Sequence, residues 1–486
     1  MWQGAFDVGE VRGGLELRMG LAGGNAGLKV RVSPRGWLEA PDASNITIAA
    51  NRVDFDADVR GERYRFSGAR TGNAYTGTMS PVGKSATGRW RVARVEAVPM
   101  PRADDILPVP TGHFVVGRTT LDWIDAGRDE LETKDPSDKR RVVVHLFYPA
   151  ASAPDRQPAP YIPDGELMRP VWKDDLTNRL LHLRTHTFAD AAVSSARAKF
   201  PVLVFIPGGA QKALSYTSLL EELTSRGYVI AALELPHNAQ GMRFPDGTLL
   251  PRVARSDRGW EEAKTREDRG RIYAGEVEHW ARDASFVLDQ LGLVNKNHVR
   301  LAGRLDLSRI GAVGHSKGGM AAGMLRLIDK RVRGAMNIDG NDRAKGFVTL
   351  ADGAGGEQPF LWLEKQFKSP TPQQLQQAGM DSAGFDAMWA EGDRLLATVR
   401  GGAKHVVIAQ PDINHLDFGD YGLWTSTADL WARATKLRTL RITIDFAAAF
   451  FDGVLNNDWR DYRQLSRDAN LPEVTTQSFG REWGVQ

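Results

Sequence analysis

The chain contains no cysteine among its 486 residues. This absence excludes disulfide bonds, zinc sites built on thiolates and a cysteine nucleophile. It leaves the compartment open, because both cytosolic and exported proteins can lack cysteine. The opening residues, MWQGAFDVGE, have neither the charged segment nor the apolar segment of a signal peptide. Between the two alternatives we favour an exported or periplasmic protein, with its signal peptide removed, over a cytoplasmic one.

Long apolar runs and blocks of basic residues are missing as well. No segment approaches the ~20 unbroken apolar residues that a membrane-spanning helix requires, and the best candidate, ITIDFAAAFFDGVL, is interrupted by aspartate. The net charge is only +3, and lysine and arginine are scattered without the cluster that follows a nucleic-acid backbone. The composition therefore predicts neither an integral membrane segment nor a nucleic-acid partner. It carries no information about the oligomeric state.

Residues 1–98 alternate between apolar and polar side chains with a period of two. Examples are LELRMGL, LKVRV and VDFDADV, and glycine-rich turns separate them. Such alternation is typical of antiparallel strands with one buried face. We therefore predict an antiparallel all-β domain, either a barrel or a sandwich, over residues 1–98. The prolines of EAVPMPRADDILPVPTG predict a linker over residues 99–111.

Residues 112–486 have a different pattern. Short apolar runs such as RVVVHLFYPA, PVLVFIPGG and RIGAVGHS alternate with helix-like stretches such as VEHWARDASFVLDQLGL. Strands buried on both faces and separated by helices predict an α/β domain with a doubly wound, mainly parallel sheet. Active sites of such sheets lie beyond the carboxyl ends of the strands. Two longer connections, near 236–275 and 365–400, are predicted to be insertions that form a lid over the site.

One apolar run ends in a pattern that exposes a serine. The run RIGAV is followed by GHSKG, in which Ser316 lies between Gly314 and Gly318. A G-x-S-x-G sequence between a strand and a helix forms a sharp turn that projects the serine above the sheet. The glycines are needed because side chains at their positions crowd the strained turn. Ser316 is therefore our candidate nucleophile, and the alternative is a merely structural turn.

A serine hydroxyl needs a base to act as a nucleophile at neutral pH. In this type of fold the base is a histidine that follows the serine and the acid along the chain. Only His405 and His415 follow Ser316. His405 lies within the strand pattern AKHVVIAQ, whereas His415 lies in the loop PDINHLDFGD after it. We therefore predict His415 as the base.

Three carboxylates are candidates for the acid that orients this histidine. Asp339 ends the run RGAMNID, Glu364 ends the next run PFLWLE, and Asp412 lies just before His415. Asp339 and Glu364 both stand at strand ends, so their positions alone do not choose between them.

An oxyanion hole requires two backbone N–H groups directed at the developing negative charge. One is expected from Lys317, the residue after the nucleophile. The other is expected from the loop PGGA that follows PVLVFI. Gly209 is our candidate donor there, and Ala210 is the alternative.

Together, the sequences GHSKGG, NIDG and HLDFGD resemble the plasma-type platelet-activating factor acetylhydrolase branch of the α/β-hydrolases, which includes bacterial esterases and lipases. The resemblance covers residues 112–470. The family's acid follows the strand after the serine turn, which implies Asp339 rather than Glu364. Its histidine opens an H-x-x-F-x-D motif, which His415 matches.

Two positions depart from the family pattern. The family often has His-Gly after the oxyanion strand, where this chain has Pro207-Gly208. Pro-Gly also occurs in cutinase-like polyester hydrolases, which usually take the acid from one strand later, so Glu364 stays an alternative. Lys317 replaces a residue that is commonly large and apolar. We expect its side chain to point to solvent rather than to select acidic or polar substrates.

The residues and the resemblance together predict a serine carboxylic ester hydrolase that forms an acyl-enzyme. The expected substrate is a small or short-acyl ester, lipid-like or aromatic, offered as a small molecule or a polymer. No metal or organic cofactor is implied. Alternatives are a cutinase-like polyester hydrolase, a serine amidase or peptidase, and a non-catalytic binding protein. Candidate pocket residues are Met388 and Trp389 in the second insertion and Trp424 after the histidine loop.

Overall fold

The fold is described from a computed structural model of the chain. The residues that it describes are 2–8, 11–22, 25–34, 43–59, 62–84, 88–94, 107–151, 156–163, 180–239, 242–253, 262–340, 356–367, 371–377, 381–410, 413–425 and 430–484.

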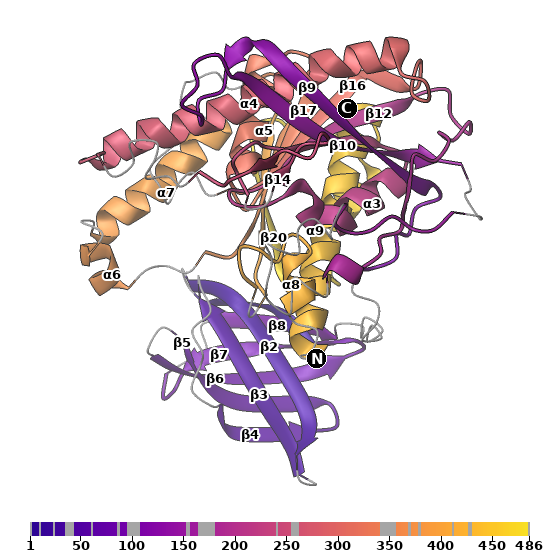
Figure 1. Cartoon of the computed structure of the whole chain (residues 1–486). Helices are drawn as coiled ribbons and strands as arrows, with labels where there is room; N and C mark the ends of the chain where they lie inside the picture. The colour runs from indigo at the N-terminus through magenta and orange to yellow at the C-terminus, as the bar shows by residue number, and fades with distance from the viewer. Residues whose placement is uncertain are drawn as a thin grey trace.

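The first eight strands form one antiparallel sheet in the order β3-β2-β1-β8-β7-β6-β5-β4. Figure 1 shows β2 and β3 crossing in front of the strands at the other edge, so the sheet folds over on itself. The predicted alternation is visible in Val53, Phe55 and Ala57, whose side chains lie fully buried in one core. The strands are β1 (Trp2–Val8), β2 (Val11–Ala22), β3 (Asn25–Pro34), β4 (Ser44–Ala49), β5 (Arg52–Val59), β6 (Glu62–Thr71), β7 (Ala74–Pro81) and β8 (Gly88–Arg94).

A second sheet of ten strands has the order β11-β9-β10-β13-β12-β16-β17-β18-β19-β20. Neighbours from β13 to β19 are all parallel, whereas β9, β10 and β20 pair antiparallel with their partners toward the centre. The predicted mainly parallel α/β sheet is therefore confirmed. The strands are β9 (Val115–Asp129), β10 (Lys139–Ala150), β11 (Thr187–Ala189), β12 (Phe200–Ile206), β13 (Val229–Glu234), β16 (Leu305–His315), β17 (Val332–Ile338), β18 (Phe360–Lys365), β19 (Ala403–Ile408) and β20 (Val474–Phe479).

Helices cover both faces of this sheet. On one face α4 and α5 pack over the central strands, and on the other face lie α3 and α9 (Figure 1). Every residue of β12 and β13 is buried between the two layers, which explains their unbroken apolar sequences. The helices are η1 (Ala213–Tyr216), α3 (Thr217–Ser225), α4 (Arg266–Asn297), α5 (Lys317–Ile328), α6 (Pro372–Gln377), α7 (Ser382–Ala397), α8 (Tyr421–Thr425), α9 (Leu430–Asn456) and α10 (Arg460–Leu465).

The two predicted insertions differ in structure. The first contains a short hairpin of β14 (Met242–Arg243) and β15 (Leu249–Leu250) and then the start of α4. The second contains α6 and α7. Their lid role and the limits of the predicted domains and linker stay predictions. Among the described helices, none is both long and apolar enough to span a membrane.

The register of the parallel strands aligns three loops at one edge of the sheet. Gly314 on β16 pairs with Ile206 at the end of β12, and His315 pairs with Ile338 at the end of β17. The residues that follow these strands therefore leave the sheet at the same level. The loop after β19 reaches the same edge, because β19 runs parallel to β18 and β17.

Candidate active site

Ser316 occupies the sharp turn between β16 and α5. Its backbone has φ 55° and ψ −125°, a conformation that residues with a side chain rarely adopt. A Cβ on Gly314 would lie 2.2 Å from the carbonyl oxygen of Gly318, and one on Gly318 would lie 2.2 Å from that of Ile206. Only glycine fits at both positions, so the flanking glycines of the sequence pattern are a steric requirement of this turn.

Three side chains that are far apart in the sequence meet at this turn. Nε2 of His415 lies 2.7 Å from Oγ of Ser316, and Nδ1 of His415 lies 2.6 Å from Oδ2 of Asp339. The other carboxylate oxygen of Asp339 accepts a hydrogen bond from the backbone N–H of Lys365, at 3.1 Å. The acid, the imidazole and the hydroxyl thus form one hydrogen-bonded row, with the geometry needed for proton transfer from the serine.

Burial sets the electrostatics of the carboxylate in this row. Asp339 is only 4% exposed, and this burial raises its pKa, while the hydrogen bond to His415 acts in the opposite direction. A buried carboxylate is stabilised most when a cation forms beside it. Asp339 therefore lies where it can interact with the positive charge that forms on the His415 ring during proton transfer.

The alternative acids are not placed against His415 in the described residues. Glu364 is buried one strand further along and lies 2.8 Å from Nε2 of His405. His405 is thus a packed residue of β19, paired with a neighbouring carboxylate. Asp412 lies outside the described residues. Asp339 is therefore the carboxylate that contacts the histidine of the loop.

The loop after β12 lies beside the nucleophile. Ala210 has a positive φ of 62°, and its N–H donates to the side-chain oxygen of Asn238 at 3.0 Å. That bond occupies the alternative oxyanion donor. A Cβ on Gly209 would lie 3.8 Å from the side chain of Lys317, so the loop of Gly209 lies beside the residue that follows the nucleophile.

The side chain of Lys317 is buried, which corrects the expectation that it points to solvent. Its ammonium group forms an ion pair with Glu276 on α4, and both residues are less than 10% exposed. The same nitrogen lies 4.6 Å from the ring centroid of Trp280 and 5.4 Å from that of Tyr273. A buried lysine is stable here because a carboxylate and two aromatic faces surround its charge.

A cavity of about 380 Å³ opens beside Ser316. Among the described residues, most of its wall is polar or aromatic, and the aliphatic side chains along it belong to Ala210 and Val253. The first insertion and α4 supply most of this wall, which the sequence patterns did not identify. The lining residues are Gly209, Ala210, His237, Asn238, Arg252, Val253, Tyr273, Glu276, Trp280, Ser316 and Lys317.

Two of the three pocket residues expected from the sequence, Trp424 and Trp389, are not among the described residues that line this cavity. Trp424 lies on α8 and packs against Tyr161, with ring centroids 5.5 Å apart. Trp389 lies on α7 beside Phe367, with ring centroids 5.4 Å apart. Met388 is also on α7, and its side chain lies outside the described residues. The role of these three residues in a substrate pocket stays a prediction.

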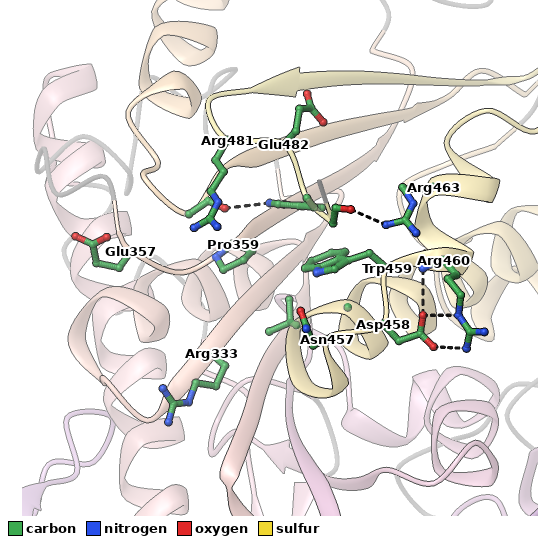
Figure 2. A pocket seen from close by; sticks show the side chains of 15 residues that line it. Arg333, Glu357, Pro359, Asn457, Asp458, Trp459, Arg460, Arg463, Arg481 and Glu482 are labelled. Atoms are coloured by element: carbon green, nitrogen blue, oxygen red, sulfur yellow. Dashed lines mark hydrogen bonds and ion pairs between the residues drawn. The ribbon is translucent and has the colours of Figure 1, made fainter. Parts of the chain in front are cut away.

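A larger cavity of about 890 Å³ lies at the other edge of the same sheet. Arg333, Pro359 and Gly401 line it, and they lie near the amino ends of β17, β18 and β19. Figure 2 shows Trp459 at its centre and charged side chains around its rim. Ser316 stands at the carboxyl end of β16, so this cavity is separate from the serine site.

Ligand atoms of His315, Asp339 and His415 lie within 4.8 Å of one another, a grouping that metal sites also show. Here hydrogen bonds account for the grouping, because both nitrogens of each ring have partners. The predicted absence of a metal stays a prediction.

Comparison with known proteins finds relatives that are named as esterases. Residues 103–242 match the model of the family described as platelet-activating factor acetylhydrolase, isoform II. A curated relative from Arthroderma benhamiae, a probable 1-alkyl-2-acetylglycerophosphocholine esterase, is 25% identical over 280 residues. That match covers 53% of this chain, and the chain spans 64% of the relative's length. The family match ends before the strand that carries Ser316.

A solved structure also resembles this fold. It is a ferulic acid esterase from Streptomyces cinnamoneus, with a TM-score of 0.58 and 27% sequence identity. The match covers 76% of this chain and 98% of that chain. Both relatives are named as esterases, so the chain shares its fold with ester-hydrolysing enzymes.

Proposed function

Because this chain is a platelet-activating factor acetylhydrolase-like α/β-hydrolase, we propose that it hydrolyses carboxylic esters through a serine acyl-enzyme. The observation that carries the proposal is the row of hydrogen bonds from Ser316 through His415 to Asp339, at 2.7 and 2.6 Å. A serine in this arrangement has a base within reach of its proton and an acid that fixes the base.

The proposed reaction has two halves. Ser316 attacks the ester carbonyl while Nε2 of His415 takes the hydroxyl proton, and Asp339 stabilises the imidazolium. The N–H groups of Gly209 and Lys317 stabilise the oxyanion. His415 then protonates the departing alcohol, which leaves an acyl group on Ser316. In the second half a water molecule, deprotonated by His415, attacks the acyl group and releases the acid and the free serine.

The cavity beside Ser316 supports a polar or aromatic ester in preference to a long aliphatic one. Its wall carries the charged groups of Arg252, Glu276 and Lys317 and the rings of Tyr273 and Trp280. An aliphatic group of the substrate gains little binding free energy there, because it would bury the charged groups of the wall without replacing their hydrogen bonds to water. An aromatic ring, in contrast, gains from stacking and from the nearby cations. The ferulic acid esterase neighbour is consistent with this preference.

The proposal is tested with p-nitrophenyl esters of graded acyl length and with an acetyl ester of a phenol. Ser316→Ala is expected to keep the fold and lose turnover by at least about 10³-fold. Asp339→Asn is expected to lower kcat by about 10³–10⁴-fold, because the histidine then takes the wrong tautomer. Glu364→Gln is the matched control, and it is expected to retain most of the activity.

Two outcomes would contradict the proposal. Near-full activity of Ser316→Ala would remove the serine from its role, and greater loss in Glu364→Gln than in Asp339→Asn would reassign the acid. Faster turnover of matched amides than of esters would favour the amidase alternative. Release of soluble fragments from an aliphatic polyester, at rates above those for small esters, would favour the polyester hydrolase.

A further inference from the structure

His315 precedes the nucleophile, and the proposed reaction gives it no role. Its ring is 1% exposed, and both of its nitrogens have partners. Nε2 lies 2.8 Å from the backbone carbonyl oxygen of His415, and Nδ1 lies 2.7 Å from the hydroxyl of Tyr216. A carbonyl only accepts hydrogen bonds, so Nε2 carries the proton and Nδ1 accepts from the tyrosine. Burial lowers the pKa of His315 well below its ordinary value, which keeps the ring in this neutral form.

The chain of hydrogen bonds extends one residue further. The backbone N–H of Gly208 donates to the hydroxyl oxygen of Tyr216 at 3.3 Å. The donors therefore all point the same way, from Gly208 to Tyr216, from Tyr216 to His315, and from His315 to the carbonyl of His415. Gly208 belongs to the loop of the proposed oxyanion donor. Two side chains thus connect that loop directly to the backbone of the proposed base.

The space around Tyr216 and His315 is closely filled. A Cβ on Gly208 would lie 2.8 Å from Nδ1 of His315 and 3.1 Å from the hydroxyl of Tyr216. A Cβ on Gly419, in the histidine loop, would lie 2.9 Å from the Tyr216 ring. The rings of His315 and His415 lie with their centroids 4.5 Å apart. The rings of Tyr216 and His315 are therefore in close contact with both loops.

We propose that Tyr216 and His315 are positioning residues that fix the loop of His415 and the loop of Gly209 relative to each other. This inference rests on the proposed function. If the His415 ring is displaced by about 1 Å, it loses the alignment that proton transfer requires. The loop of His415 is connected to the sheet edge through these hydrogen bonds. The hydrogen bond from the hydroxyl of Ser316 to Nε2 of His415 is the contact that these bonds maintain.

The test uses three variants, which are Tyr216→Phe, His315→Phe and the double variant that carries both changes. Tyr148→Phe is the control with which they are compared. Tyr148 is a matched control, because it is buried and its hydroxyl donates to the carbonyl of Ala191 at 2.7 Å, away from the serine. We call the hydrogen bonds from Gly208 through Tyr216 and His315 to His415 the relay, and Tyr216→Phe and His315→Phe the relay variants. Each relay variant is expected to lower kcat for p-nitrophenyl acetate by about tenfold with little change in KM, since one hydrogen bond is worth about that factor. The double variant is expected to lose no more than His315→Phe, because the bonds act as one unit.

Two further measurements distinguish loss of the position of His415 from a general loss of protein stability. His315→Gln retains an N–H near the carbonyl of His415 and is expected to recover part of the kcat lost in His315→Phe. The low-field proton resonance of the hydrogen bond between His415 and Asp339 is expected in the wild type and is expected to broaden in both relay variants. Tyr148→Phe is expected to lower thermal stability while leaving kcat and this resonance unchanged.

The outcomes are distinct. Full kcat and an unchanged low-field resonance in Tyr216→Phe and His315→Phe would overturn the relay and leave the proposed function standing. Additive losses in the double variant would also overturn it, because independent contacts add. A wild type without activity on any ester would overturn the proposed function, and the low-field resonance would then decide the relay by itself.

Discussion

Lys317 shows how much a single side chain beside the nucleophile is constrained by its surroundings. Its ammonium group is buried against Glu276 and lies over the ring of Trp280. A buried ion pair is costly to break from one side, because the remaining buried charge loses its opposite charge. The residue that supplies a proposed oxyanion N–H is thereby attached to α4, the helix that forms one wall of the cavity.

Replacement of this lysine is predicted to affect stability more than catalysis. Lys317→Met keeps the backbone N–H but leaves Glu276 buried without its cation, so we expect a loss of about 3–5 kcal/mol in unfolding free energy. The double variant Lys317→Met with Glu276→Gln is expected to regain most of that loss, because the buried negative charge is removed together with the positive one. Urea unfolding of the two variants checks this, and equal stability of both would contradict it.

The sequence located residues that stand at strand ends and missed those that do not. Ser316, Asp339 and His415 each follow an apolar run, and the topology of parallel strands brings such residues to one edge. Glu364 met the same criterion, and the structure separates the two carboxylates by their partners, which are His405 for Glu364 and His415 for Asp339. Tyr273 and Trp280 carry no such signal, because their place in the cavity depends on how α4 is rotated and packed against the sheet.

At the level of elements, the histidine loop is joined to α3 by a buried carboxylate. Asp420 accepts hydrogen bonds from the backbone N–H of Ser218, in the first turn of α3, and from the hydroxyl of Tyr161 at 2.9 Å. It is fully buried, and this burial raises its pKa to about 7, although both hydrogen bonds act in the opposite direction. The carboxyl therefore holds its proton more tightly in the folded chain than in the unfolded one.

This raised pKa predicts a pH dependence of stability. The proton on Asp420 stabilises the folded state fully below pH 3.8, the ordinary value, and this contribution is lost as the pH rises to about 7. Asp420→Asn cannot titrate, so its unfolding free energy is expected to fall less steeply across that range than the wild type's. Urea unfolding at several pH values measures the slopes, with Glu278→Gln on the exposed face of α4 as control. Identical slopes for Asp420→Asn and wild type would refute the assignment.

At the level of the whole molecule, the two sheets have separate hydrophobic cores. The core of the first sheet is formed by residues from Trp2 to Val92, and the cores of the second sheet begin at Phe114 and Val116. The alternating pattern predicted the first sheet well, because period-two burial depends only on neighbouring strands. How the sheet folds over on itself was left open between a barrel and a sandwich, because strand order is not encoded in that pattern.

A chain shortened to residues 107–486 is predicted to keep its esterase activity. The cavity lining and the row of hydrogen bonds come entirely from the second sheet and its connections. We therefore expect kcat for p-nitrophenyl acetate within about threefold of the full chain, since the site keeps all its described contacts. A folded truncated protein that has lost most of its turnover would show that the first sheet contributes to the site.

The acyl-enzyme itself provides the most direct measurement of the proposed mechanism. The full chain is mixed with a p-nitrophenyl ester, quenched in acid during turnover, digested and analysed by mass spectrometry. The mechanism predicts one acyl group, attached to the peptide that contains Ser316, and no acylation of that peptide in the Ser316→Ala variant. An active enzyme whose acyl group lies on another residue, or that never becomes acylated, would contradict it.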